Sequence, residues 1–215
     1  MNIRNLDTII FDFDGVIFDT EPLWFKASIK TLKKLNLPFN KKITYKSTIG
    51  IHSDKVFEML INKKLNLSTL NKINKVFKIE LHKTFNKKLK PFSYLENFIK
   101  NNKAELLIVS NSDYAFIEKL LKQADLKKYF KTKNIISCTK KLKPKPDPDG
   151  YNVAIKKLNL KRNNILVIED SENGISGAKK AGIKNIFRFT NNNYNLSKKI
   201  KHKNIKNIKS YKDLI

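Results

Sequence analysis

Residues 6–24 read LDTIIFDFDGVIFDTEPLW, an apolar run that leads into a group of acidic residues. Its first part, Leu6–Phe11, is short and rich in β-branched residues, as is typical of a buried strand. Asp12 and Asp14 follow at once, and side chains two residues apart in extended backbone point to the same side. These residues therefore predict a buried strand that ends in two carboxylates directed the same way.

Apolar strands alternate with helical stretches in the part of the chain that follows Pro91. We expect strands at Glu105–Val109, Asn134–Ser137, Ile165–Ile168 and Asn185–Phe189. Helices are expected around them, at Tyr94–Asn101, Tyr114–Gln123, Asp149–Leu158 and Gly174–Ala181. Strands that alternate with helices form βα units, which assemble into a parallel sheet. The fold class is therefore α/β, with a Rossmann-like, doubly wound parallel sheet as its core.

A helical insert separates the first strand from this alternating region. Between Glu21 and Leu89 apolar residues recur at helical spacing, and no segment has the pattern of a strand. The insert is about seventy residues long, which is within the size range of a small domain. We therefore expect an inserted all-helical unit.

Small polar and acidic residues follow three of the predicted strands. They are Asp12 and Asp14, then Ser110, Asn111 and Ser112, and finally Glu169 and Asp170. Ligands bind beyond the carboxyl ends of the strands in open α/β sheets, so these groups should converge on one crevice. Any single serine among them would fit a helix cap or a turn equally well. It is the coincidence of three strand ends that predicts a functional site.

Four carboxylates in one crevice require a positive partner. Like charges at close range raise one another's pKa and destabilise the fold unless a cation lies between them. Mg²⁺ prefers oxygen ligands and commonly takes one or two protein carboxylates together with substrate phosphate oxygens. We therefore expect Mg²⁺ as cofactor. The segment KPKPDP at residues 143–148 could supply a lysine as well, because its prolines hold the backbone extended just before a helix.

The charge of the chain is strongly basic, with 45 basic and 19 acidic residues and a formal net charge of +26. Only Arg4, Arg162 and Arg188 are arginines, whereas base readout and bidentate phosphate contacts favour arginine over lysine. Because Asn and Ile are also abundant, the lysines fit an AT-rich coding bias. We expect no specific nucleic-acid partner and only non-specific affinity for polyanions.

The length of 215 residues and the hydrophobic content of 40% are sufficient for a packed core. No apolar stretch approaches the roughly 20 residues of a spanning helix, and no signal-peptide region precedes Asp7 and Asp12. The single cysteine, Cys138, agrees with a reducing compartment. We expect a cytoplasmic monomer without a membrane partner. Its lysine-rich tail, Lys198–Lys209, carries three isoleucines and should pack on the surface.

Four segments of the chain resemble, in order, the four motifs of the haloacid dehalogenase superfamily. They are FDFDGVIFDTEPLW at 11–24, LLIVSNS at 106–112, KPDPDGY at 145–151 and VIEDSENGISGAKKAGI at 167–183. The chain is similar to the branch of β-phosphoglucomutase-like phosphatases, which carry a helical cap after the first motif. The resemblance implies a catalytic core at residues 1–19 and 90–215, a helical cap at residues 20–89, and a small phosphorylated metabolite, such as a sugar phosphate, as substrate.

The acidic residues acquire roles from this resemblance. Asp12 matches the nucleophile that forms an aspartyl-phosphate, and Asp14 matches the acid/base that protonates the leaving oxygen and then activates water. Asp170 and Glu169 match the metal ligands, joined by Asp12 and by the backbone carbonyl of Asp14.

The resemblance likewise implies which residues bind the phosphate group. Ser110 matches the hydroxyl of the second motif, and Asn111 beside it belongs to the same candidate set. Lys145 matches the lysine of the third motif, because only that register is followed by Asp149-Gly150-Tyr151. Lys143 also begins a Lys-Pro-x-Pro-Asp string and is the alternative lysine.

Other activities of the superfamily fit the sequence less well. Dehalogenases lack the second aspartate of the first motif, which is present here as Asp14. β-Phosphoglucomutases carry a histidine where Trp24 stands, so we favour hydrolysis and keep the phosphomutase as the alternative. A non-enzymatic receiver-like phospho-acceptor module also groups acids, a hydroxyl and a lysine at strand ends, but it has no helical insert after the first strand.

Overall fold

The computed structural model describes residues 6–86, 88–139, 141–190 and 205–215. The chain divides into two compact units: a core unit, Met1–Asp19 with Leu89–Ile215, and a helical unit, Thr20–Lys88. The expected bounds of 1–19 with 90–215 and of 20–89 differ from this division only at residue 89. Each unit is described by itself.

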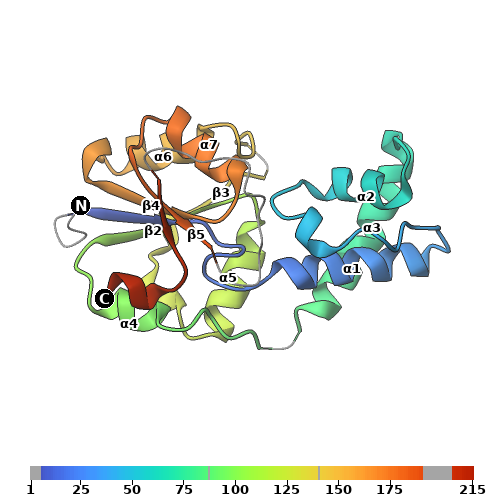
Figure 1. Cartoon of the computed structure of the whole chain (residues 1–215), viewed down its shortest axis with the longest axis horizontal. Helices are drawn as coiled ribbons and strands as arrows, with labels where there is room; N and C mark the ends of the chain where they lie inside the picture. Colours follow the sequence, from blue (N-terminus) through green and yellow to red (C-terminus); the bar gives the residue numbers. More distant parts are fainter. Residues whose placement is uncertain (1–5, 87, 140, 191–204) are drawn as a thin grey trace. The chain divides into compact units, whose positions relative to one another are not determined.

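The core unit is built on one parallel sheet of six strands (Figure 1). The strands are β1 (Thr8–Phe11), β2 (Glu105–Ser110), β3 (Ile135–Ser137), β4 (Ile165–Glu169), β5 (Asn185–Phe189) and β6 (Lys206–Ile208). Their order is β3-β2-β1-β4-β5-β6, and every neighbouring pair is parallel. The order reverses at β1, and ligands bind beside such a reversal in doubly wound sheets. The predicted α/β class and Rossmann-like sheet are confirmed.

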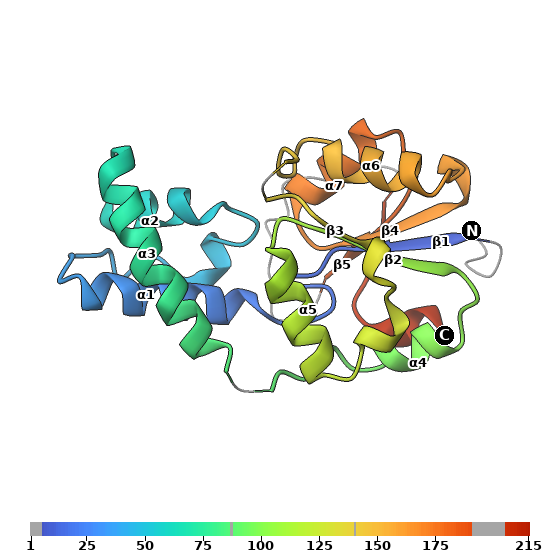
Figure 2. The same cartoon turned by 180° about the vertical axis from the view of Figure 1, so that it is seen from behind.

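Helices cover both faces of this sheet (Figures 1 and 2). One face carries α6 (Asp149–Lys157) and α7 (Glu172–Lys180), and the other carries α4 (Leu95–Lys100) and α5 (Tyr114–Gln123). Alternate strand residues such as Ile165 and Val167 are fully buried in a cluster with residues of α6 and α7. Because both faces are covered, the central strands β1, β2 and β4 are largely apolar and buried, as the sequence predicted.

An aromatic cluster fills the α4 side of the sheet. Phe11 of β1 lies 6.4 Å from Phe98, 6.0 Å from Phe130 and 6.3 Å from Tyr211, measured between ring centroids. The hydroxyl of Tyr211 is itself buried and donates to the backbone carbonyl of Val16 at 3.0 Å. The residues at the far end of the chain therefore hold the loop that follows Asp14.

Side-chain caps turn the chain into helices directly after two of the strands. Behind β2, Asp113 Oδ1 accepts from the backbone nitrogen of Ala115 and caps α5. Behind β4, Ser171 Oγ accepts from the nitrogen of Gly174 and caps α7. Such caps satisfy amide groups that a helix leaves unpaired at its first turn. They fix short loops at the carboxyl edge of the sheet.

The helical unit contains α1 (Glu21–Lys34), α2 (Ser53–Ile61) and α3 (Leu67–Thr84) (Figure 2). Helices α1 and α3 lie side by side, and their apolar stripes meet in a separate small core. Trp24 of α1 packs 5.9 Å from Phe77 and 5.8 Å from Phe85, measured between ring centroids. The predicted helical character of this insert is thus present in the structure.

Two expectations need correction. The tail Lys198–Lys209 was expected to be surface packing, but Lys206–Ile208 forms the edge strand β6, with Ile208 buried; residues 198–204 lie outside the described residues. A single buried isoleucine in a lysine-rich run is too weak a pattern to predict a strand. Helix α7 begins at Glu172, before the predicted Gly174, because Ser171 caps it.

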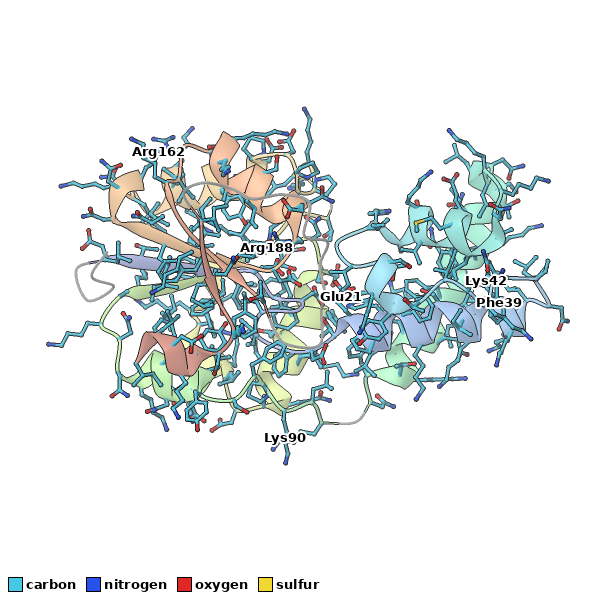
Figure 3. The ribbon with its side chains drawn as sticks, in the orientation of Figure 1. Glu21, Phe39, Lys42, Lys90, Arg162 and Arg188 are labelled. Atoms are coloured by element: carbon cyan, nitrogen blue, oxygen red, sulfur yellow. The ribbon has the colours of Figure 1, made fainter. Side chains whose placement is uncertain are left out.

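The described arginines have partners within the core unit. Arg188 Nη1 lies 2.8 Å from Glu172 Oε1, and Arg162 Nε donates to the carbonyl of Ala181 at 2.8 Å. Figure 3 shows both arginines on the core unit, together with many lysine side chains that project outward.

Among the helices of the described residues, none has the length and apolar character needed to cross a membrane.

Candidate active site

Three buried carboxylates meet at the carboxyl edge of the sheet. Strands β1 and β4 pair in register, with Phe11 opposite Ile168. The next residues, Asp12 after Phe11 and Glu169 after Ile168, therefore lie side by side. Carboxylate oxygens of Asp12, Glu169 and Asp170 all lie within 4.8 Å of one another, and none of these residues is more than 7% exposed. The sequence placed these acids at one crevice, and the structure brings all three together.

Lys145 lies among these carboxylates. Its Nζ atom is 2.5 Å from Asp12 Oδ1 and 2.8 Å from Glu169 Oε1, and its side chain is only 3% exposed. Lys143, the alternative lysine, is exposed. Of the two lysines, the structure therefore brings Lys145 to the acidic residues.

Asn111 holds the backbone of Lys145. The backbone nitrogen of Lys145 donates to Asn111 Oδ1 at 2.9 Å, and Asn111 Nδ2 donates to the carbonyl of Lys145 at 3.4 Å. The Asn111 side chain thus pairs with both the backbone N–H and the backbone carbonyl of Lys145. Its contact with Lys145 makes Asn111 a support for the lysine, a role that the sequence did not indicate.

The electrostatics of the cluster follow from its burial. Burial raises the pKa of Asp12 to about 8, and the Lys145 ammonium opposes that rise. Burial alone would lower the pKa of Lys145, but the charges of Asp12 and Glu169 outweigh it and hold this pKa well above its usual value. Lys145 is therefore a fixed ammonium ion. A further cation beside Asp12 would favour its ionised form in the same way.

Asp14 is separate from the three-carboxylate group. Among the described residues that group consists of Asp12, Glu169 and Asp170, and the carboxylate of Asp14 instead accepts a hydrogen bond from Ser112 Oγ at 2.5 Å. The backbone nitrogen of Ser112 in turn donates to Ser110 Oγ at 2.9 Å. The sequence placed Ser112 in the same crevice as Asp14, with a helix cap as the alternative role, but it gave no signal of this particular hydrogen bond.

Two glycines allow the backbone to approach the acidic residues. A Cβ atom on Gly15 would lie 2.1 Å from Asp170 Oδ2, and one on Gly174 would lie 1.6 Å from Glu169 Oε1. Gly15 also has a φ angle of +73°, which side chains disfavour. Both glycines lie in the predicted motifs, and at each position a Cβ atom would overlap an acidic side chain of the site.

A profile of haloacid dehalogenase-like hydrolases matches residues 9–187, which covers the described site from β1 to β5. The chain belongs to this family. The superfamily expected from the four motifs is thereby confirmed. The site of this hydrolase contains Asp12, Lys145, Glu169 and Asp170 in direct proximity, with Asp14 beside them in the first motif.

Curated relatives of this hydrolase include phosphatases and a mutase. A phosphorylated carbohydrates phosphatase of Thermotoga maritima is 26% identical over 185 residues, covering 85% of this chain and 84% of the relative. The β-phosphoglucomutase of Bacillus subtilis is 27% identical over 188 residues, which cover 83% of this chain and 81% of the relative. A HAD hydrolase structure from Entamoeba histolytica is 21% identical with a TM-score of 0.80, covering 98% and 96%, and it supports the fold.

The donor set of the hydrolase fits a hard divalent cation. Asp12, Glu169 and Asp170 offer only oxygen atoms, at mutual distances that one ion can bridge. Oxygen donors of this kind suit Mg²⁺, whereas softer metals prefer nitrogen or sulfur ligands. Glu169 is already engaged, because its Oε2 accepts from the nitrogen and the hydroxyl of Ser171 at 2.7 and 3.0 Å. Of the three residues, Asp12 and Asp170 are therefore better placed than Glu169 to hold such a cation.

Proposed function

We propose that this hydrolase is a Mg²⁺-dependent phosphatase that releases phosphate from a small phosphorylated metabolite, with a sugar phosphate as the expected class. The observation that carries the proposal is the contact of the Lys145 ammonium with Asp12, at 2.5 Å in a buried cluster of acids. The arrangement combines a carboxylate nucleophile with positive charge for a phosphoryl group. Named relatives that act on phosphorylated carbohydrates support the substrate class.

In the first step of this proposal, an oxygen of Asp12 forms a bond to phosphorus while the bond between phosphorus and the metabolite oxygen breaks. Asp14 donates its proton to that leaving oxygen, so the metabolite departs as an alcohol. The product is an acyl phosphate, the aspartyl-phosphate of Asp12. Lys145 offsets negative charge on the transferring group.

In the second step, water attacks phosphorus and Asp14 accepts a proton from it. The bond between Asp12 and phosphorus breaks, which restores the carboxylate and releases inorganic phosphate. A divalent cation held by Asp12 and Asp170, with Glu169 and the backbone carbonyl of Asp14, would neutralise the phosphoryl oxygens.

Ser110 and Asn111 contribute differently to phosphate binding in this proposal. Ser110 is buried at the end of β2 and supplies the hydroxyl for a phosphoryl oxygen. Asn111 acts through Lys145, whose backbone it holds by two hydrogen bonds. The helical unit, Thr20–Lys88, serves in this proposal as the cap that selects the substrate, as the resemblance implies.

A phosphomutase is the second candidate function, and a relative named β-phosphoglucomutase favours it. Against it stands Trp24, which occupies the position of the mutase histidine and packs in the core of the helical unit against Phe77 and Phe85. Supplying β-glucose 1-phosphate with a trace of the 1,6-bisphosphate separates the two. Glucose 6-phosphate formed faster than inorganic phosphate would favour the mutase.

Assaying the purified chain tests the main proposal. Phosphorylated sugars, nucleotides, phosphoglycolate and p-nitrophenyl phosphate are incubated with Mg²⁺, and released phosphate is measured. We expect release from at least one sugar phosphate, loss of it with excess EDTA, and recovery with added Mg²⁺. The Asp12→Asn variant should be inactive on every compound. Full activity of the wild-type protein in EDTA, or activity of Asp12→Asn at the wild-type level, would overturn the site assignment.

A further inference from the structure

The second serine of the Ser110-Asn111-Ser112 segment is directed at Asp14. Ser112 Oγ donates to Asp14 Oδ2 at 2.5 Å, although the two residues are 98 positions apart in the chain. Ser112 is buried, whereas Asp14 is partly exposed. The distance between Ser112 Oγ and Asp14 Oδ2 is within the range of strong hydrogen bonds from a hydroxyl to an ionised carboxylate.

Ser112 is itself fixed from both sides of its backbone. Its nitrogen donates to Ser110 Oγ at 2.9 Å, and its carbonyl accepts from Ser137 Oγ at 2.7 Å. The next residue, Asp113, caps helix α5 through Ala115. Three strand or helix ends therefore determine where the Ser112 hydroxyl lies: those of β2, β3 and α5.

We propose that Ser112 is a positioning residue that orients the carboxyl group of Asp14 for proton transfer. This inference rests on the proposed phosphatase function, in which Asp14 protonates the leaving oxygen. An aspartate side chain in a loop can rotate about two bonds, and a general acid is effective only within hydrogen-bonding reach of the atom it serves. By holding Oδ2, Ser112 restricts that rotation and sets the plane of the carboxyl group.

This role predicts a dependence on the leaving group. p-Nitrophenolate departs readily without a proton, whereas phenolate is more basic and gains more from the acid. The two substrates, p-nitrophenyl phosphate and phenyl phosphate, have the same shape near the phosphate group. Other contacts with the protein should therefore affect both similarly. A misplaced Asp14 should therefore slow phosphoryl transfer from phenyl phosphate more than from p-nitrophenyl phosphate.

The experiment measures the first step by rapid mixing, as the rate at which each phenol is released before steady state. We expect Ser112→Ala to lower this rate about 10–100-fold for phenyl phosphate and less than about threefold for p-nitrophenyl phosphate. Ser112→Thr retains a hydroxyl and should recover most of the loss. Ser210→Ala is the control, because it removes a serine hydroxyl that caps the turn at Tyr211–Leu214.

The outcomes separate this inference from the function on which it rests. Equal losses on both compounds, or no recovery in Ser112→Thr, would overturn the positioning role while leaving the phosphatase intact. Wild-type protein that transfers no phosphoryl group from either compound with Mg²⁺ present would overturn the proposed function, and the positioning role with it. In an Asp14→Asn background, adding Ser112→Ala should cause no further selective loss on phenyl phosphate, because Ser112 then has no acid to orient; a further selective loss there would overturn the inference.

Discussion

Lys145 Nζ lies 2.8 Å from Glu169 Oε1, and neither side chain is more than 3% exposed. The other oxygen of Glu169 accepts two hydrogen bonds from Ser171, the residue that caps α7. One carboxylate therefore connects the proposed phosphate-binding lysine to the start of a helix. Its removal should affect both stability and activity.

Glu169→Gln should destabilise the folded protein by about 3 kcal/mol, because it leaves the buried Lys145 ammonium with Asp12 as its remaining carboxylate partner. Urea unfolding measures the change. Asp125→Asn removes one partner of the exposed pair with Lys128 and should cost under about 1 kcal/mol. Similar losses of unfolding free energy in the two variants would show that the buried pair stabilises the protein no more than the exposed pair does.

Lys145→Met should lower kcat/KM for p-nitrophenyl phosphate at least about 100-fold, since it removes the positive charge beside the transferring group. Lys143→Met removes an equal charge two residues away, from an exposed side chain, and should stay within about twofold of wild type. Circular dichroism establishes that both variants fold. The roles of the two lysines would have to be exchanged if Lys143→Met were the inactive variant.

Mg²⁺ should stabilise the wild-type protein, since a ligand that binds only the folded state raises its stability by about 2.7 kcal/mol at one hundred times Kd. Thermal unfolding with and without Mg²⁺ measures this, and EDTA should reverse it. Asp170→Asn removes a proposed ligand and should abolish the rise in Tm. Glu118→Gln removes an acid from α5 instead and should retain it. An equal rise in Asp170→Asn would place the cation elsewhere.

Gly174→Ala should destabilise the core unit by about 2 kcal/mol, because its Cβ would lie 1.6 Å from Glu169 Oε1 and 2.0 Å from Glu169 Cδ. Gly177→Ala, in the same helix, meets its nearest atom at 3.2 Å and gains helix propensity. Its effect should be smaller than about 1 kcal/mol. Chemical denaturation of the two variants gives the comparison, and a Gly174→Ala protein as stable as Gly177→Ala would contradict the packing argument.

Cys138 provides a test of pH dependence. Burial raises the pKa of its thiol to about 11, so at pH 8 the folded protein holds far less thiolate than an unfolded chain. Alkylation by iodoacetamide at pH 8 should be at least about 100-fold slower in the folded protein than in urea. The folded rate should rise about tenfold for each pH unit up to pH 10. Because the chain has one cysteine, comparable rates in both states would refute the burial argument directly.

The fold was predictable where strands are apolar and buried on both faces. Strand β5 and helix α5 have the bounds that the sequence predicted, and the other elements of the central sheet differ by a few residues. β6 was missed because an edge strand with one buried residue, Ile208, has little hydrophobic pattern. A strand of this kind is stabilised by pairing with β5, which is a long-range interaction.

The candidate site was predictable at the level of strand ends, and less so at the level of contacts. Parallel strands bring their carboxyl ends to one edge, which is why Asp12, Glu169 and Asp170 could be grouped from sequence. The contacts of Asn111 with the Lys145 backbone, and of Ser112 with Asp14, depend on the directions of side chains in short loops. No spacing rule encodes those directions, so they required coordinates.

The contact of Tyr211 with the Val16 carbonyl has a consequence for biosynthesis. These residues are 195 positions apart, so at about 5–20 residues per second a ribosome adds Tyr211 about 10–40 s after Val16. Throughout that interval the nascent chain carries its acidic first loop without the aromatic ring that later holds it. The loop that follows the proposed nucleophile Asp12 therefore reaches its final set of contacts only after the ribosome has added Tyr211.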